Sequence, residues 1–493
     1  MLFEVSWEVC NKVGGIHTVL ATKAPVIKKH IKDHIYVGPW LFDNQKNFIE
    51  KPATKKLAGI FEDLQKQGVY CRYGTWNIDA KPKVILVEFT GLIHKKDAIK
   101  TELWDLYNID SLFSRWEFEE PILWSTAVGM LVDAYDKTTR SKTIAHFHEW
   151  MAGAAILHLK KVKSKVKTVF TTHATMLGRT ISGHHRDLYK ELDTIDADSL
   201  AKEYCIQDKH LTEKACALNA DVFTTVSEIT GKECSAFYGK NPDAFVYNGI
   251  SSISVKNTGK LRSLIEKIFP GYKNAPLFFN SGRYEFHDKG MDYFIDALAE
   301  IKDEKAVALF LVPAQNYGPK KELEQGAENL HVTHYLFDED NDAIVWNLKN
   351  KGLDNNCNLK TLFIPIYIAE DDDFFNESYY TVISECNLGV FPSIYEPWGY
   401  TPLECSEMGI PAVTTTNAGY GLYMKQFLQQ KGTDGVFVLN METVVPELVS
   451  VLKQFSNAES HEANKISAKG LAQHAQWSVL VENYLKIYEQ LQK

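Results

Sequence analysis

Residues 390–409 have the sequence VFPSIYEPWGYTPLECSEMG. The apolar residues at 388–391 predict the end of a buried strand, and the segment with prolines and a glycine after it predicts a loop. Thr401 is a typical N-cap residue and Pro402 suits the first helical position, so we expect a helix to begin there. A strand, a loop and a helix N-terminus in this order offer unpaired N–H groups and partial positive charge, which suit a phosphate.

Two carboxylates frame this segment, Glu396 in the predicted loop and Glu404 in the predicted first helical turn. An ordinary strand–loop–helix connection with capping acids would show the same residues, because such units are generic in α/β proteins. The residues alone therefore leave a phosphate-binding and a purely structural interpretation open.

The string YEPWGYTP at 395–402 resembles the signature of glycogen synthases of the animal and fungal type. Glu396 and Glu404 are eight positions apart, which is similar to the two-glutamate spacing of retaining glycosyltransferases with two Rossmann-like domains. The resemblance implies that Glu396 lies near the transferred glucose and that Glu404 binds the ribose hydroxyls of the donor. The other substrate-binding residues implied by this string are Trp398, Gly399, Tyr400 and Thr401.

The composition predicts a globular protein with two or three domains, since the chain has 493 residues of which 45% are apolar. A net charge of −9 argues against a nucleic-acid partner. No apolar run approaches the length of a membrane span, and acids stand where a signal peptide has bases. The eight cysteines show no zinc-type spacing, which predicts reduced thiols in a cytoplasmic protein. Alternating strand and helix patterns predict an α/β fold with parallel sheets.

The first predicted strand, residues 2–9, runs into a loop with two adjacent glycines, and a helix is expected from about residue 18. A Gly-Gly pair lets backbone N–H groups approach a ligand, but a tight turn is its commoner cause. The string EVCNKVGGI at 8–16 resembles the glycogen synthase loop that reaches over the donor sugar and pyrophosphate. It implies substrate contacts for Lys12, Gly14 and Gly15. The early strand also predicts that no leader is present.

The string HFHEW at 146–150 ends another predicted strand. His146 and His148 share a strand face and could bind a metal, but no carboxylate or cysteine partner has a recognisable spacing, so we predict no metal. A hydrogen-bonded structural histidine is the ordinary alternative. The string resembles the His-Glu-Trp loop of the family, which implies that His148 lies beside the transferred glucose and that Glu149 orients the loop.

The string THATMLGR at 172–179 resembles the family pattern THATxxGR. The match implies that Arg179 lies at the cleft, near donor or acceptor, whereas a surface position is the default for a single arginine. Residues 104–135 are rich in aromatics and predict a helical stretch of core residues. Residues 417–421 predict a glycine-rich loop.

A second Rossmann-like unit is predicted from residue 277, with a strand, a loop at 281–290 and a helix from residue 291. Arg283 and Lys289 flank that loop at the carboxyl edge of the strand, where ligands bind in open α/β sheets. The guanidinium of Arg283 and the ammonium of Lys289 suit a diphosphate. In the alternative interpretation Lys289 is merely solvated and Arg283 forms a structural ion pair. Arg283 is the one arginine after residue 277, and the string SGRYEFHDKG resembles the phosphate-binding pair of the family. The alignment further implies that Tyr379 stacks on uracil, with core packing as the alternative.

The resemblance covers essentially the whole chain and implies two Rossmann-like domains with an interdomain cleft, the GT-B architecture. We predict an N-terminal, acceptor-side domain at 1–252, a nucleotide-sugar-binding domain at 253–475, and a C-terminal helix at 476–493 that crosses back to the first domain. The implied reaction transfers glucose from UDP-glucose to the 4-hydroxyl at the non-reducing end of an α-1,4-glucan such as glycogen, with retention. We expect no cofactor, no metal, no nucleic acid and no membrane partner.

Three other functions stay open at this stage: a related transferase that uses ADP-glucose, a catalytically silent glycan-binding protein, and a phosphorylase-like enzyme with pyridoxal phosphate. A homo-oligomer is possible, but the segment at 317–357 is shorter than the insertion that assembles tetramers in the animal and fungal enzymes. Residues 460–475 offer Lys465 and Lys469 where regulated relatives carry an arginine cluster. We therefore predict no activation by glucose 6-phosphate.

Overall fold

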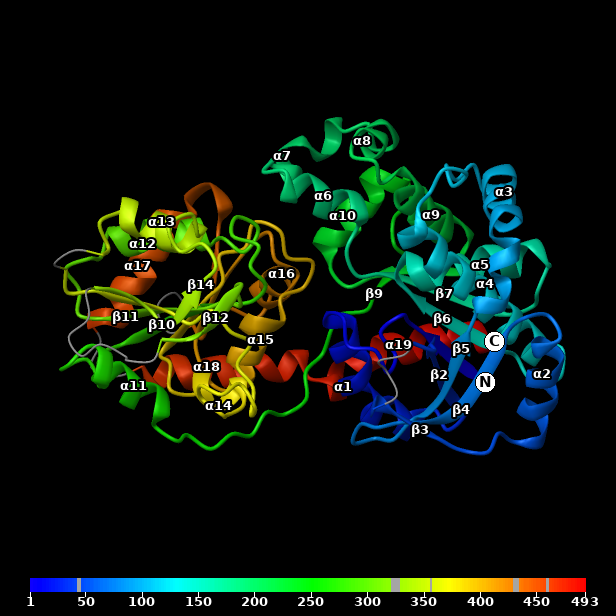
Figure 1. The fold of residues 1–493 in the computed structure, drawn as a ribbon, viewed down its shortest axis with the longest axis horizontal. Helices are drawn as coiled ribbons and strands as arrows, with labels where there is room; N and C mark the ends of the chain where they lie inside the picture. The colour runs from blue at the N-terminus through cyan, green and yellow to red at the C-terminus, as the bar shows by residue number, and fades with distance from the viewer. Residues whose placement is uncertain (42–45, 321–328, 355–356, 429–433, 458–460) are drawn as a thin grey trace. The chain divides into compact units, whose positions relative to one another are not determined.

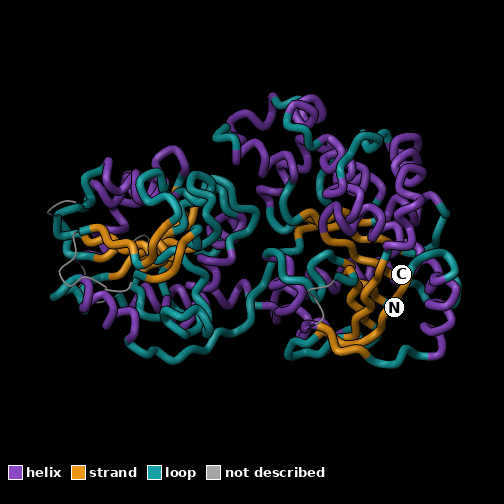
Figure 2. Tube along the Cα trace, viewed as in Figure 1, coloured by secondary structure: helices purple, strands orange, loops and turns teal. Residues whose placement is uncertain are grey.

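The computed structural model describes residues 1–41, 46–320, 329–354, 357–428, 434–457 and 461–493. These residues form two compact units, each built around its own sheet (Figures 1 and 2). The first unit comprises Met1–Ile181, Arg186–Ser251 and Trp477–Lys493, and the second comprises Ser182–His185 and Ser252–Gln476. Among the described residues no helix has the length and apolar character needed to cross a membrane.

The first unit contains a nine-stranded sheet. Its strands, in sheet order, are β3 (Phe48–Glu50), β4 (Tyr70–Trp76), β5 (Lys83–Glu88), β2 (His34–Pro39), β1 (Leu2–Val5), β6 (Ile144–His148), β7 (Lys167–Thr172), β8 (Val222–Thr225) and β9 (Ala244–Phe245). Neighbours pair in parallel from β5 to β9, as the sequence predicts, whereas β3 and β4 form an antiparallel edge that it did not predict.

Helices surround this sheet, and the last helix of the chain packs on the first. They are α1 (Gly15–His30), α2 (Lys55–Gln65), α3 (Lys96–Tyr107), α4 (Trp116–Asp136), α5 (Glu149–Lys161), α6 (Met176–Gly183), α7 (Leu188–Glu191), α8 (Ala197–Glu203), α9 (Gln207–Asn219), α10 (Glu228–Tyr238) and α19 (Trp477–Gln492). The indole N–H of Trp477 donates to the Thr22 hydroxyl on α1 over 2.7 Å, and Tyr488 of α19 contacts His146 on β6 over 2.7 Å. Helix α19 therefore completes the core of the first unit.

The second unit contains a seven-stranded, fully parallel sheet. Its strands, in sheet order, are β13 (Leu330–Val332), β15 (Lys360–Phe363), β11 (Val307–Leu311), β10 (Leu277–Ser281), β16 (Leu388–Val390), β17 (Ala412–Thr415) and β18 (Val436–Leu439). A separate two-stranded sheet pairs β12 (Asn316–Pro319) with β14 (His334–Leu336). The helices are α11 (Lys260–Ile268), α12 (Met291–Ala299), α13 (Ala343–Asn350), α14 (Tyr379–Ile383), α15 (Tyr400–Glu407), α16 (Gly419–Lys425), α17 (Val444–Asn457) and α18 (Glu462–Ala472).

The central strands of this second sheet are apolar throughout because both of their faces are covered. Phe278 and Phe310 point into one buried cluster, and the adjacent residues Phe279 and Leu309 point into the other. A strand alternates its side chains between faces, so a sheet with helices on both sides requires continuous apolar runs. Burying each of these side chains stabilises the fold by roughly 1.5–3 kcal/mol.

Several predicted element boundaries are wrong. The first strand stops at Val5 rather than residue 9, and its helix begins at Gly15. The stretch 104–135 is interrupted between α3 and α4, where Asn108 adopts a left-handed conformation that ends α3. The predicted loop at 417–421 is partly helical, because α16 begins at Gly419. The core role of the aromatic stretch holds for Trp124 but not for Trp104, which is 45% exposed.

Each sheet reverses its strand order at one point. In the first sheet the reversal lies between the neighbours β1 and β6: the chain continues to one side of β1 with β2 and to the opposite side of β6 with β7. In the second sheet it lies in the same way between β10 and β16. In open parallel sheets the crevice at the carboxyl ends of such a pair of strands is the usual ligand site. The loops after these four strands carry most of the residues that the sequence singles out.

Candidate functional site

In the second unit, the loops after β10 and β16 are fastened to each other. The amide of Ile394 donates to the carbonyl of Asp288 over 2.9 Å. Gly290 has a left-handed φ of 63°, and a Cβ atom there would lie 2.0 Å from the carbonyl oxygen of Pro392. Only glycine fits this close approach without strain. The predicted phosphate loop and the EPWGYTP loop therefore form one structural element.

Acidic and basic side chains alternate along this element. A guanidinium nitrogen of Arg283 lies 3.1 Å from a Glu285 oxygen, and the other Glu285 oxygen lies 3.9 Å from Lys289 Nζ. Lys289 Nζ donates to Glu396 Oε2 over 2.6 Å. The Arg283 side chain is 60% exposed, so its pairing with Glu285 is weak and exchangeable. The structure thus brings Arg283, Lys289 and Glu396 together, with two cations available to an incoming anion.

Helix α15 (Tyr400–Glu407) begins two residues earlier than predicted. Gly399, with a φ of 110°, is its N-cap, so Thr401 is not the cap and Pro402 is the third helical residue. The positive φ of Gly399 explains the difference, since this conformation turns the chain into the helix without a side-chain cap. Glu404 consequently lies beyond the first turn, where the first-turn charge effect of a helix no longer acts on it.

Glu404 is held by a tyrosine. The Tyr380 hydroxyl donates to Glu404 Oε1 over 2.8 Å, and burial raises the pKa of Glu404 to about 7 against that hydrogen bond. The neighbouring Tyr379 hydroxyl lies 2.6 Å from Ser281 Oγ at the end of β10. The Trp398 ring is 3% exposed and packs against Tyr420 and Tyr423, so its side chain is part of the core.

In the first unit, the glycine loop after β1 is already occupied by a carboxylate. Glu8 Oε2 accepts hydrogen bonds from the amides of Gly14 and His17, over 2.8 and 2.9 Å. A Cβ at Gly14 would lie 3.1 Å from Glu8 Oε1. In this conformation the Gly14 N–H is therefore bound by Glu8, which caps α1, and is not open to a ligand. Lys12, on this loop, and Gly15, the first residue of α1, are exposed.

His148, at the end of β6, is buried in a charged network. Its Nε2 lies 3.0 Å from Glu4 Oε1 and its Nδ1 lies 2.9 Å from His173 Nε2. Glu4 also forms an ion pair with Lys23 and lies 3.1 Å from His34 Nε2. Burial would raise the pKa of Glu4, but the Lys23 ammonium and the histidine contacts hold it well below its ordinary value. Glu4 is thus a buried carboxylate that the sequence did not reveal.

The sequence predicted no metal because it shows no carboxylate partner for the two histidines, and Glu4 shows that this reason was wrong. Glu4, His146 and His148 place three possible ligand atoms within 4.8 Å of one another. A carboxylate partner does exist, on the neighbouring strand β1. However, Lys23 neutralises Glu4, and both His146 nitrogens lie within hydrogen-bond distance of hydroxyls, those of Tyr488 and Thr171. A cation would have to displace these partners, so the donor set does not fit a metal.

Three carboxylates, two of them buried, fix the loop between β7 and α6. Glu149 Oε1 accepts from the amides of His173 and Ala174 (2.7 and 3.1 Å), so it holds the loop after β7 rather than the His-Glu-Trp loop that the sequence implies. The two other acids are Glu213, which accepts from the Met176 amide over 3.0 Å, and Glu233, which accepts from the Thr175 hydroxyl over 2.6 Å. A Cβ at Gly178 would lie 2.4 Å from Glu233.

Arg179 follows this loop and is exposed. Its charge lowers the pKa of Glu149, although burial is the larger effect and raises that pKa to about 7. It acts in the same direction on Glu8 and Glu213, whose pKa values burial raises. Arg179 therefore acts electrostatically on three carboxylates of the first unit, and its place beside donor or acceptor stays a prediction.

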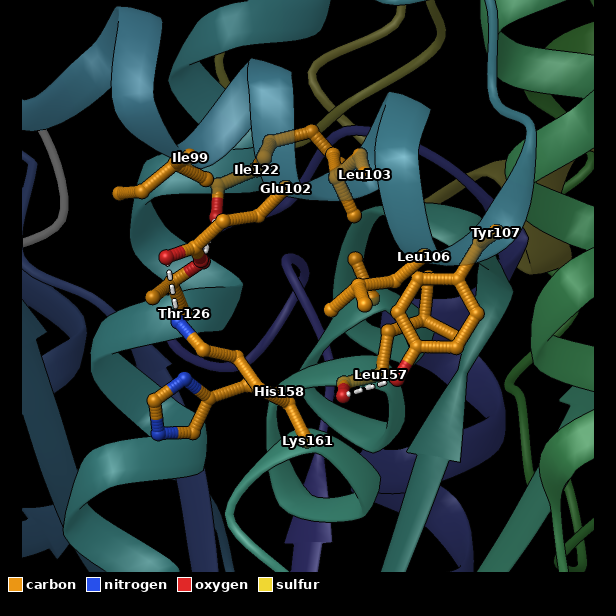
Figure 3. Close-up of a pocket in the computed structure, with 11 residues that line it drawn as sticks. Ile99, Glu102, Leu103, Leu106, Tyr107, Ile122, Thr126, Leu157, His158 and Lys161 are labelled. Atoms are coloured by element: carbon orange, nitrogen blue, oxygen red, sulfur yellow. Dashed lines mark hydrogen bonds and ion pairs between the residues drawn. The ribbon is translucent and has the colours of Figure 1, made fainter.

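A small pocket lies elsewhere in the first unit, between α3, α4 and α5 (Figure 3). Leu103, Leu106 and Ile122 form its apolar wall, and the Glu102–Lys161 ion pair of 2.5 Å closes one side. None of the residues that the sequence predicts for the site lines this pocket. It therefore adds nothing to the chemistry of the two loop clusters.

The chain is similar to known proteins over most of its length. The family model described as glycogen synthase matches residues 4–317 and 324–491. A glycogen [starch] synthase of Caenorhabditis elegans is 29% identical over 92% of this chain and 82% of its own length. Isoform 2 from Saccharomyces cerevisiae is also 29% identical, over 92% of this chain and 80% of its own length.

Solved structures show the same fold at much lower identity. A sucrose-phosphate synthase from Thermosynechococcus elongatus has a TM-score of 0.59 and 13% identity, covering 99% of this chain and 98% of its own. The catalytic domain of starch synthase IV from Arabidopsis thaliana, bound to ADP and acarbose, has a TM-score of 0.58 and 14% identity, with 100% and 99% coverage. These matches show the GT-B fold of glycosyltransferases.

Proposed function

This chain belongs to the glycogen synthase family of glycosyltransferases, and from that premise we propose that it transfers glucose from UDP-glucose to the 4-hydroxyl at the non-reducing end of an α-1,4-glucan, with retention. The observation that carries the proposal is the placement of the candidate residues. Those of the first unit follow β1, β6 and β7, and most of those of the second follow β10 and β16, so each set includes the loops at the strand-order reversal of its own sheet. We assign the acceptor side to the first unit and the nucleotide sugar to the second.

The second unit supplies the groups that a departing nucleoside diphosphate requires. As the bond between the sugar and the phosphate breaks, negative charge grows on the diphosphate and positive charge on the sugar ring. Arg283 and Lys289 stabilise the first, together with the N–H groups at the start of α15. In the free protein Glu396 is paired with Lys289. Its carboxylate is assigned to the sugar, where it would stabilise the positive charge that develops on the ring.

The nucleoside is assigned to the pair of tyrosines and Glu404. Glu404 offers a carboxylate to the ribose hydroxyls, and Tyr380 holds it in place. Tyr379 presents a ring beside the end of β10, where it supports the uracil assignment made from the sequence. Contacts from Trp398, whose ring is buried, are assigned to its backbone, and Gly399, Tyr400 and Thr401 are assigned to the phosphate end.

The test is the release of UDP from UDP-glucose with glycogen as acceptor, for the parent protein and for Arg283→Ala. Removing a cation that stabilises the leaving group should lower turnover about 100- to 1000-fold while the fold survives. Lys267→Ala, at an exposed position on α11, is the matched control and should keep full activity. Near-normal turnover of Arg283→Ala would refute the phosphate assignment, and faster turnover of ADP-glucose would refute the donor. Glycogen binding without UDP release would show a silent glycan-binding protein.

A further inference from the structure

Both ring nitrogens of His148 already have hydrogen-bond partners. Nε2 contacts Glu4 and Nδ1 contacts His173, over 3.0 and 2.9 Å, and the side chain is 1% exposed. In this arrangement neither nitrogen is available to a substrate. The network continues, however, to a second imidazole at the carboxyl end of β7.

The hydrogen atoms of this network follow from its first member. Glu4 is ionised because it pairs with the Lys23 ammonium, so it can only accept. His148 must therefore donate from Nε2, and because burial keeps its pKa low the ring is neutral and its Nδ1 accepts. His173 must then donate from Nε2. Its ring is also neutral, since burial and the neighbouring His148 lower its pKa, so its Nδ1 carries a lone pair and no proton.

His173 Nδ1 is the atom at which this hydrogen-bonded network ends. Among the described parts of the chain, no hydrogen-bond partner contacts His173 Nδ1, although the side chain is 8% exposed. The backbone beneath it is fixed, because the His173 and Ala174 amides donate to Glu149. His173 Nδ1 is not one of the fully buried polar atoms that lack a partner, so it stays accessible from outside. A rigidly held acceptor that a ligand can reach is suited to receive the hydrogen of a hydroxyl group.

We propose that His173, through Nδ1, accepts a hydrogen bond from a hydroxyl group of the transferred glucose, and that Glu4 and His148 are positioning residues that fix its orientation and tautomer. The proposal rests on the proposed function and refines it, because it moves the sugar contact from His148 to His173. A neutral acceptor selects a hydroxyl and rejects a phosphate or carboxylate oxygen. His173 therefore contributes to the choice of sugar and takes no part in holding the diphosphate.

The experiment compares UDP-glucose with donors that lack the 2-, 3-, 4- or 6-hydroxyl, measured as kcat/KM with glycogen. For the parent protein, kcat/KM should be about tenfold lower or more with the one donor that lacks the contacted hydroxyl than with UDP-glucose, because a site built to bind a hydroxyl discriminates against a donor without it. His173→Gln keeps a donor toward His148 but has no acceptor at Nδ1, so that donor-specific loss should shrink to about onefold. His148→Asn keeps an acceptor for His173, so its donor-specific loss should stay within about twofold of the parent's even where its overall turnover is lower.

Selectivity among the donors distinguishes a direct contact between His173 and the sugar from a structural role of His173, because a damaged fold lowers the turnover of all donors alike. His158→Gln, on α5 beside the small pocket, is the matched control and should resemble the parent in every ratio. The proposal is overturned if His173→Gln keeps the parent's selectivity, or if His148→Asn alone abolishes it. A parent protein that releases no UDP from UDP-glucose would instead refute the proposed function, and the inference with it.

Discussion

The carboxyl group of Glu404 should make the protein less stable as the pH rises, and Glu404→Gln should remove that effect. Burial raises the pKa of Glu404 to about 7 from a model-peptide value of 4.5. A carboxyl whose pKa is raised on folding binds its proton more tightly in the folded state. Its contribution to stability is complete below pH 4.5 and is lost as the pH rises through 7.

The size of the effect follows from these two values. One pKa unit corresponds to about 1.4 kcal/mol, so ionising the buried carboxyl costs about 3 kcal/mol at pH 8.5 and about 1 kcal/mol at pH 5.5. Glutamine has nearly the same shape, has no charge and still accepts the hydrogen bond from Tyr380. Glu404→Gln should therefore stabilise the second unit relative to the parent by about 2 kcal/mol more at pH 8.5 than at pH 5.5.

Differential scanning calorimetry at the two pH values measures this difference. The melting temperature of Glu404→Gln minus that of the parent should increase with pH. Glu300→Gln, at an exposed carboxyl at the end of α12, is the control, and its difference should stay near zero at both pH values. A difference for Glu404→Gln that is flat between pH 5.5 and 8.5 would show that the carboxyl is not desolvated and would refute the reasoning.

Three further predictions concern the loops of the second unit and regulation. Glu396→Gln should bind UDP several-fold more tightly in calorimetric titrations, because Lys289 loses a competing anion 2.6 Å away, and its turnover should fall; weaker UDP binding would contradict this. Gly290→Ala should destabilise the protein by about 3 kcal/mol or more in thermal unfolding, since it combines a left-handed φ with a clash against Pro392. Gly271→Ala is its control, because φ is also positive there but nothing lies within 4 Å, and an equal loss for both variants would exclude the clash. Glucose 6-phosphate should leave the rate of UDP release unchanged, and a stimulation of twofold or more would show a binding site that the sequence does not display.

The sequence predicted those parts of the site that lie within a few residues of each other. Strand β16, its loop and helix α15 follow from one apolar run, two prolines and a glycine, and the structure confirms this order. The exact start of α15 was missed because the positive φ of Gly399 competes with the capping tendency of Thr401, and sequence propensity cannot rank the two. The position of the loop at 281–290 was equally predictable, since it directly follows strand β10, and its phosphate role stays a proposal.

Interactions between distant segments could not be predicted. Glu4 and His148 are 144 positions apart, and they meet because β1 and β6 are neighbours across the strand-order reversal. Glu213 and Glu233 reach the loop at 173–178 from helices α9 and α10, with no spacing signal in the sequence. A single buried carboxylate looks like any other glutamate until the sheet order is known, which is why the histidine network could be drawn only from the structure.

The free protein keeps its anion-binding groups paired with its own carboxylates. Lys289 contacts Glu396, Arg283 contacts Glu285, and the Gly14 amide contacts Glu8. The Lys289 side chain is 15% exposed, and an unpaired cation at such a position costs free energy, so Glu396 stabilises it before a ligand arrives. On the proposed function, donor binding exchanges one anion for another, and a diphosphate with several oxygens replaces the single contact that each carboxylate provides. Such an exchange would favour a ligand that engages both cations at once over a monovalent anion.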